Sequence, residues 1–294
     1  MANTSTQQAA RNQRTGRRSS TRPAARGKVL ARVIVAVQIL LALVPTVIIA
    51  IWAFADAWPW PDALPQAFSM RGMDLVLSGG AGGGLDSLLL SIGIGLASAA
   101  LSTLVGAMAA RAIALHSWRG RTAFEFITFL PFLVPATVFA MGVQIVFIRI
   151  GLAGSVLGVI LVHSIVSLPY AVAIMIDITR AAGTRMEEAA RTLGARWPVV
   201  LTQITAPSLL PGIISSMTMC YIISVSQYFL TLLVGSGKVR TFALVLFPYL
   251  TGGDRTVAGA YGLTFLVTTF AIFFASEILL RRLRALDNAE LYAA

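Results

Sequence analysis

The sequence contains few residues whose types and spacing could carry out chemistry. Residues 235–238 read Gly-Ser-Gly-Lys, which resembles the end of a phosphate-binding loop. Leu232 stands where such a loop has its first glycine, and Val239 stands where it has serine or threonine. We therefore interpret this segment as an ordinary loop. No other nucleotide-binding motif of this type occurs in the sequence.

A histidine beside serines could indicate nucleophilic catalysis, and His163 lies close to Ser164 and Ser167. The Gly-x-Ser-x-Gly context of a serine hydrolase is missing, as is a His-Glu-x-x-His zinc motif. We interpret His163 as a hydrogen-bonding residue between helices, and we predict no catalytic residue. Cys220 is the single cysteine, which excludes an internal disulfide and a thiol-rich metal site.

One charged residue differs from the others because small residues follow it. Glu188 precedes Ala189 and Ala190, and residues 185–193 are good helix formers. Gly194 is the expected left-handed end of this short helix. The two alanines leave one helix face bare, so that another protein can approach closely, and Glu188 offers an anion to a basic group of that protein.

The amino-acid composition indicates that the chain carrying these residues is a membrane protein. Of the 294 residues, 57% are hydrophobic and only 12% are charged, whereas a soluble globular domain has about 25% charged residues. The net charge of +11 would suit nucleic acid. However, the positive charges lie between long apolar runs rather than on one soluble face, so we predict no nucleic-acid partner.

Six apolar segments are long enough to cross the hydrocarbon core of a bilayer, which takes about 20 residues. These segments are residues 33–55, 87–110, 124–148, 152–176, 210–234 and 257–280. Each must be helical, because lipid offers no partner to an unpaired backbone group. The sequence therefore predicts an all-α polytopic membrane protein with six transmembrane helices. The first run could be a secretory signal, but its length and the five later segments favour an uncleaved anchor.

The distribution of positive charge predicts the orientation of these helices. With the N-terminus inside, eighteen of the 23 Lys and Arg residues fall in cytoplasmic segments and five in outer loops. Both termini are then cytoplasmic, as are the loop 177–209 and the C-terminal tail 283–294, while residues 56–86 form an outer loop. Residues 1–32 carry eight of the cations without apolar periodicity. They predict a disordered basic tail that contacts membrane lipid.

The loop 177–209 contains a sequence motif that extends beyond the short helix, from Glu188 to Pro207. It resembles the signature of the permease subunits of binding-protein-dependent ABC (ATP-binding-cassette) importers, which reads Glu-Ala-Ala, three residues, Gly, nine residues, then Ile-x-Leu-Pro. The matching residues are Glu188, Ala189, Ala190, Gly194, Ile204 and Pro207. Ala206 replaces the usual leucine at a packing position. The resemblance covers the five later spans and identifies residues 87–282 as a permease core.

This resemblance implies a transport protein of the bacterial inner membrane, with neither enzymatic activity nor a cofactor of its own. In that family the short helix docks into a cleft on an ATPase and transmits the closure of the ATPase to the membrane helices. The six matching residues are therefore the predicted coupling site. The implied partners are two ATPase subunits, a second permease that is identical or paralogous, and an extracytoplasmic solute-binding protein.

Polar residues within the spans are candidates for lining a solute pathway. Gln144 lies in the third span, and Ser224, Gln227 and Tyr228 lie in the fifth. Polar groups in a membrane either line a wet cavity or hold helices together, and both interpretations remain open for these four. Residues 226–241 resemble the polyamine, iron and thiamine branch of the family. Three prolines, Pro131, Pro135 and Pro169, predict interruptions of the third and fourth helices.

The main alternative function is a secondary transporter of a small solute. Such a transporter would show paired ionisable residues near the bilayer centre or two related halves. The acids of the spans, Glu125 and Glu277, lie near span ends instead. The absence of a catalytic constellation disfavours a membrane-embedded hydrolase. The sequence thus favours a permease of an importer and does not identify the transported solute.

Overall fold

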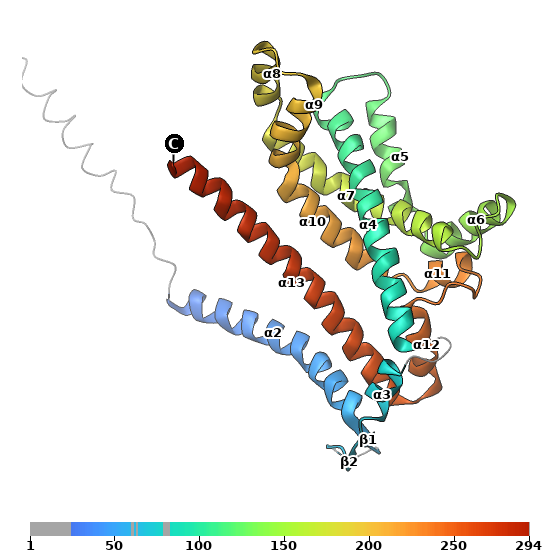
Figure 1. Ribbon diagram of the computed structural model, residues 1–294. Helices are drawn as coiled ribbons and strands as arrows, with labels where there is room; N and C mark the ends of the chain where they lie inside the picture. Colours follow the sequence, from blue (N-terminus) through green and yellow to red (C-terminus); the bar gives the residue numbers. More distant parts are fainter. Residues whose placement is uncertain (1–24, 60–61, 63, 79–82, 294) are drawn as a thin grey trace, which may run out of the picture. The chain divides into compact units, whose positions relative to one another are not determined.

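The computed structural model describes residues 25–59, 62, 64–78 and 83–293 (Figure 1). Regular structure in these residues is helical apart from one two-stranded sheet, which confirms the all-α fold class. Most of the predicted basic tail, residues 1–24, lies outside the described residues. The chain divides into two compact units, 1–48 and 49–294, and each is described by itself below.

Helix α2 (Ala25–Phe54) contains the first predicted span and crosses the boundary between the units. It begins before residue 33, so residues 25–32 of the predicted disordered tail are helical instead. Large apolar side chains between Val33 and Ile48 are exposed, for example Leu41 at 68%. An apolar helix with such a surface suits a lipid environment, where every backbone hydrogen bond is made within the helix.

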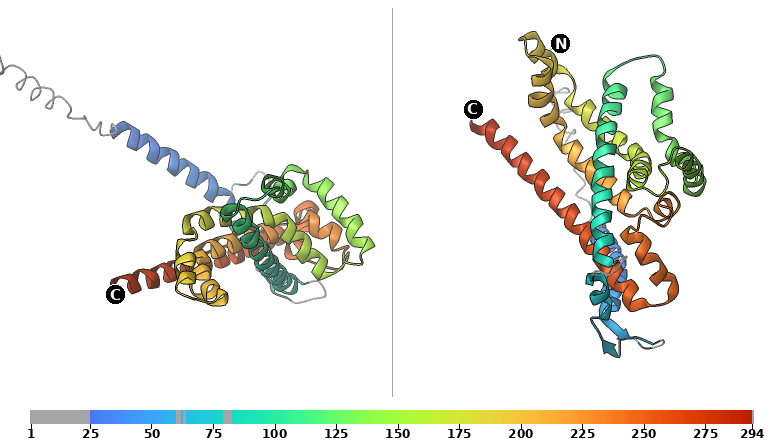
Figure 2. Two further views of the ribbon diagram at one scale, coloured as in Figure 1. Left: turned by 90° about the horizontal axis from the view of Figure 1, so that it is seen from above. Right: turned by 45° about the vertical axis from the view of Figure 1, so that its right-hand side comes forward.

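Three long helices, α4 (Gly84–Leu115), α7 (Val156–Ala182) and α10 (Ala206–Val225), pack together as the core of the second unit (Figures 1 and 2). At the end of this core that carries α8, buried apolar side chains of all three helices form one cluster: Ala109, Ala110, Ile113, Val172, Met175, Ile176 and Leu209. The three helices therefore form one close-packed layer of side chains at this end.

Small and hydroxylated residues allow these helices to approach closely. A Cβ atom added to Gly106 of α4 would lie 2.6 Å from the Cβ of Ala171 in α7. Between the helices, Ser102 Oγ donates to the carbonyl oxygen of Ser164 at 3.0 Å. Without a hydrophobic drive between helices in lipid, close packing and hydrogen bonds of this kind hold membrane helices together.

The third predicted span, residues 124–148, is broken rather than continuous. Helices α5 (Arg121–Leu133) and α6 (Ala136–Arg149) meet at a bend of 106°. Pro135 causes the break, because proline disfavours helical backbone at the preceding residue, and Val134 is extended at φ −89°, ψ 130°.

The other two prolines interrupt only the hydrogen-bond ladder of their helices, because proline has no N–H, and do not end the helices. Pro131 lies within α5 and Pro169 within α7, and both helices continue through them. A proline inside a helix removes one hydrogen bond without necessarily ending the helix, because neighbouring membrane helices re-satisfy the freed groups.

The fifth predicted span, residues 210–234, needs correction at both ends. Helix α9 (Trp197–Val200), the π-helical turn η1 (Leu201–Thr205) and α10 form one continuous helical segment that ends at Val225. Pro207 falls in the first turn of α10, after a widened turn in which the Ala206 N–H donates to the Leu201 carbonyl. Residues 226–228 then separate α10 from the short helix α11 (Phe229–Val234).

At the end of the second unit opposite α8, short elements surround the start of the last helix. They are the antiparallel strands β1 (Ala55–Ala57) and β2 (Ala67–Phe68), helix α3 (Arg71–Leu77) and helix α12 (Phe242–Gly252). Helix α13 (Arg255–Ala293) contains the sixth predicted span and continues into the predicted C-terminal tail.

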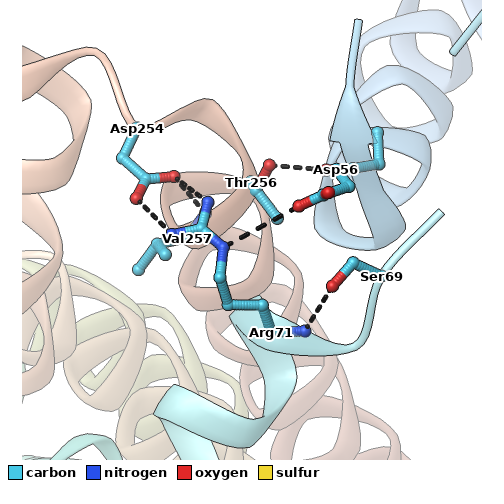
Figure 3. A network of polar contacts seen from close by, with 7 residues as sticks. Asp56, Ser69, Arg71, Asp254, Thr256 and Val257 are labelled. Carbon is cyan, nitrogen blue, oxygen red and sulfur yellow. Dashed lines mark hydrogen bonds and ion pairs between the residues drawn. The ribbon is translucent and has the colours of Figure 1, made fainter. Parts of the chain in front are cut away.

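An arginine ties α3 to the start of α13 (Figure 3). Both terminal nitrogens of Arg71 donate to the Asp254 carboxylate at 3.1 Å, and Asp56 lies 4.0 Å from its Nε. Asp254 also accepts the backbone N–H of Val257 at 3.2 Å. Arg71 is half exposed, so this network positions the elements more than it stabilises the protein.

Five of the described helical segments are long and apolar enough to cross a membrane, and six are counted if the bent pair α5–α6 is one span. The polytopic membrane fold predicted from the sequence is therefore confirmed.

Candidate functional site

The predicted coupling helix is present as α8 (Arg185–Thr192), at one end of the core formed by α4, α7 and α10 (Figures 1 and 2). Gly194 follows it with φ +87°, which confirms the predicted left-handed end. Pro198 then occupies the first turn of α9, as suits a residue without an N–H. The helix formers, the terminating glycine and the proline in the sequence thus account for the local structure of this segment.

Helix α8 presents its predicted contact residues to the outside. It has no buried residue, and both Glu188 and Ala189 are exposed, while Ala190 is half-buried. Thr184 Oγ1, at the start of the helix, donates to Glu188 Oε1 at 2.6 Å. The Glu188 carboxylate is exposed and also lines the cavity of about 1130 Å³ described below, together with Glu187.

The remaining signature residues lie beside α8 but differ in exposure. Ile204, in η1, is half-buried and lines a cavity of about 170 Å³ together with Met186 of α8. Pro207, in the first turn of α10, is exposed. The structure therefore brings the six predicted coupling residues to one end of the molecule.

Sequence reasoning missed the residue that attaches α8 to the core. Glu187 accepts from both terminal nitrogens of Arg111, in the last turns of α4, at 2.9 Å each. Thr205 Oγ1 of η1 donates to the same carboxylate at 2.8 Å. The hydrogen bond from Arg111 lowers the pKa of Glu187, and the bond from Thr205 adds to this while partial burial opposes it. The carboxylate is therefore charged at neutral pH.

A signal for this attachment exists in the sequence but is weak. Glu187 and Glu188 are successive acids on one helix, so they point about 100° apart and can meet different surroundings. Arg111 is the single cation within the predicted second span and its immediate end. Nothing in the spacing connects two residues that lie 76 positions apart.

A cavity of about 1130 Å³ opens beside the Arg111–Glu187 pair. Its lining comes from the last turns of α4, from the loop after α4 with Trp118, from α8 and from the α9–α10 segment, and it includes both Glu187 and Glu188. The space beside α8 is therefore not filled by side chains of the core.

The four candidate pathway residues lie in two different settings. Ser224 is buried at the end of α10, and the side chain of Gln144 donates to the Leu233 carbonyl oxygen at 3.2 Å. Gln227 and Tyr228 are half-buried in the break between α10 and α11, where the Tyr228 ring stacks on Phe247 at 4.1 Å.

His163 holds this break in place. Its Nδ1 lies 2.9 Å from Ser224 Oγ, and its Nε2 lies 3.0 Å from Thr231 Oγ1. Thr231 donates its own proton to the Gln227 carbonyl at 2.7 Å. The His163 Nε2–H must therefore donate to Thr231, which leaves Nδ1 to accept from Ser224. The histidine joins α7, α10 and α11, as the interpretation of a helix-to-helix hydrogen bond requires.

We expect His163→Ala to lower the thermal stability of the purified protein. The substitution leaves the buried Ser224 hydroxyl without its acceptor and removes the donor to Thr231, which keeps its bond to the Gln227 carbonyl, at a cost of roughly 1–3 kcal/mol. The measurement is the melting temperature in detergent, with His116→Ala as the matched control because His116 is exposed. Equal melting temperatures for the two variants would contradict the structural role of His163.

Comparison with known proteins supplies the family. The family described as "Binding-protein-dependent transport system inner membrane component" matches residues 102–285. The chain is 24% identical over 198 residues to the spermidine/putrescine transport system permease protein PotC of Haemophilus influenzae, covering 67% of this chain and 77% of that protein. It is 32% identical over 188 residues to the molybdenum transport system permease protein ModB of Mycobacterium tuberculosis, covering 58% and 71%.

The fold is also similar to that of solved importers. A chain of a bacterial ABC transporter involved in the import of alginate matches with a TM-score of 0.67 and 17% identity, over 87% of this chain and 97% of that chain. A chain of the MetNI methionine ABC transporter matches with a TM-score of 0.56 and 14% identity, over 74% and 99%.

These similarities decide between the importer and the secondary transporter in favour of the importer. The match extends over most of the chain and includes α8, the segment that carries the signature. The chain belongs to the family of binding-protein-dependent transport system inner membrane components, and it is a multi-pass permease subunit of an ABC importer.

Proposed function

We propose that this permease couples to two separate ATPase subunits through α8, and that Glu188 is the anion it presents to them. The observation that carries the proposal is the exposure of Glu188 and Ala189 on a helix that has no buried residue. An exposed, short, small-residue helix at the end of a packed core can enter a cleft of another protein. The charge of Glu188 suits a basic group in that cleft.

The proposal includes the arrangement in the membrane. Both termini and the loop 177–209 are cytoplasmic, and residues 56–86 face outward, as the excess of Lys and Arg on one side favours. Residues 87–282 form the permease core. A second permease, identical or paralogous, completes the pathway, and an extracytoplasmic binding protein delivers the solute on the outer side. Closure of the ATPases moves α8 and switches the access of the pathway.

Glu188→Lys should abolish coupling while the protein still inserts normally. The charge reversal repels the basic group of the ATPase, and the spans are untouched because α8 lies outside the core. The measurements are co-purification of the ATPase and solute-stimulated ATP hydrolysis in reconstituted vesicles with the binding protein. Asp177→Lys is the matched control, since Asp177 is an exposed acid near the end of α7 outside α8. Wild-type coupling in Glu188→Lys would remove the main support for the proposed function.

We further propose that Gln227 and Tyr228 line the solute pathway. They stand in the break between α10 and α11, where unwound backbone is tolerated in a membrane only if it is buried in protein or lines a cavity. Their half-buried side chains leave surface that solute can contact.

Cysteines placed at these two positions should react with small water-soluble thiol reagents, in a background in which Cys220 is replaced by alanine. The rate of labelling should change when ATP is trapped in the complex. Ser216→Cys serves as the unreactive control because Ser216 is fully buried between α10 and α4, where it bonds Thr103. Absence of labelling at residues 227 and 228 in every nucleotide state would assign them to helix packing.

A further inference from the structure

All polar contacts between α8 side chains and the other helices converge on one carboxylate. In the described structure of residues 185–192, the side-chain bonds that leave the helix for α4 or η1 are those of Glu187. Glu188 bonds Thr184 at the start of its own helix, and Thr192 bonds the Glu188 carbonyl within it. The attachment of α8 to the core is therefore narrow and identifiable.

The geometry of this attachment is rigid. Both nitrogens of the Arg111 fork meet both oxygens of Glu187, an arrangement that fixes orientation as well as distance. The two side chains are only 22% and 12% exposed. Such a pair is screened far less by solvent than a surface ion pair. Thr205 adds a third bond from a different element, so the carboxylate joins α4, α8 and η1 at one point.

Arg111 lies in a segment of α4 that packs tightly against the other core helices. Its neighbours Ala110 and Ile113 are fully buried in the cluster shared by α4, α7 and α10. The end of α4 is also held by the chain that follows, since Trp118 Nε1 donates to the Ala112 carbonyl at 3.2 Å. A displacement of the Arg111 guanidinium is therefore passed to packed helices rather than dissipated in a loose helix end.

The connections of α8 along the chain are different in character. Gly183, before the helix, has φ +64°, and Gly194, after it, has φ +87°. A Cβ atom at either glycine would meet nothing within 4 Å. Each end of α8 is thus a glycine turn without side-chain contacts, and the Glu187 carboxylate is the connection that bonds α8 to the core.

We propose that Glu187 is a positioning residue that transmits the movement of α8 to α4 through Arg111 and to α10 through Thr205. This inference rests on the proposed coupling function of α8, and it separates two tasks within that helix. Glu188, which is exposed and whose carboxylate bonds Thr184 at the start of its own helix, contacts the ATPase. Glu187, which bonds Arg111 and Thr205, converts the position of α8 into a position of the membrane helices.

The test uses the full complex of permease, ATPase and binding protein in vesicles. Glu187→Gln keeps the size of the side chain but removes the charge that orients Arg111. We expect ATPase co-purification to stay at the wild-type level, while solute transported per ATP hydrolysed falls by about tenfold, the size of a typical coupling free energy between sites. The same loss is expected for Arg111→Gln.

The double variant Glu187→Arg with Arg111→Glu reverses the pair and should recover most of the transport per ATP that each single charge reversal loses. Thr205→Val serves as a milder variant, since it removes one bond and keeps the ion pair, and it should give a smaller loss of the same kind. These two variants keep the test informative if Glu187→Gln fails to reach the membrane.

Two outcomes would overturn the proposal. Wild-type transport per ATP in both Glu187→Gln and Thr205→Val would show that α8 acts on the core by another route. Loss of ATPase co-purification in Glu187→Gln, as in Glu188→Lys, would place Glu187 in the docking contact instead. The proposed function itself fails separately, through wild-type coupling of Glu188→Lys.

Discussion

Gly106→Leu should leave almost no folded permease in the membrane. The position of Gly106 in α4 allows no side chain: a Cβ atom would lie 2.6 Å from the Ala171 Cβ and 3.2 Å from its backbone carbon. Backbone atoms of α7 cannot yield as a flexible side chain can. Overpacking in a well-packed interior costs about 1–3 kcal/mol where neighbours can adjust, and more where they cannot. Because α4 packs on both α7 and α10, separating one contact loosens the whole core.

The matched control is Gly93→Leu in the same helix. Gly93 is exposed, and a Cβ atom there would meet nothing within 4 Å. Both variants add the same side chain and the same helix propensity, so only the contact with α7 differs. The measurement is the yield of monodisperse protein in detergent by fluorescence-detected size exclusion. Comparable yields for the two variants would mean that α4 and α7 are not in the close contact described.

Gly194→Val should give a protein that folds and inserts but fails to couple. Gly194 has φ +87° and open space around it, so the obstacle is the backbone conformation and not a clash. A β-branched residue at positive φ is unfavourable by on the order of 1–2 kcal/mol. The chain relieves this strain by changing the turn after α8, which changes the direction in which Glu188 points. We expect a large fall in ATPase co-purification at unchanged membrane level.

The variant Gly194→Asn shows whether the effect of Gly194→Val comes from the backbone conformation or from the presence of a side chain. Asparagine tolerates the left-handed region better than other residues with a side chain, and its volume is similar to that of valine. Coupling should therefore be retained in Gly194→Asn and lost in Gly194→Val. A loss in both variants would indicate instead that the ATPase needs the bare surface of glycine at this position.

The parts of the site that were predictable depend on neighbours in sequence. The extent of α8 and the left-handed Gly194 follow from helix formers and a terminating glycine within ten residues, and the structure agrees at both. The apolar spans are equally local, because a stretch of side chains suited to lipid identifies each one. Pro135 also acted locally, on the residue just before it.

The parts that were not predictable depend on contacts between distant segments. The Arg111–Glu187 pair joins residues far apart in sequence, and it forms only if the C-terminal end of α4 lies beside α8 in the fold. Whether Pro131 and Pro169 break their helices depends on neighbouring helices, which single-residue rules do not contain. The limits of the fifth span were misplaced because an apolar run does not show how far a helix extends before the run or whether it ends within it: the helical segment begins at Trp197 and ends at Val225.

The widened turn η1 has a consequence for changes in chain length. A π-helical turn holds more residues than the α-helical turn it replaces, and successive helical residues are rotated by roughly 100°. The extra residue within 201–205 is taken up inside one turn, so α9 keeps its angular phase relative to α10. Deletion of one residue there would close the turn to an α-helical turn and leave the faces of α9 and α10 aligned. The same deletion within α10 would rotate the preceding helical segment by roughly 100°. The alignment of this segment therefore tolerates a change in chain length at η1 but not within α10.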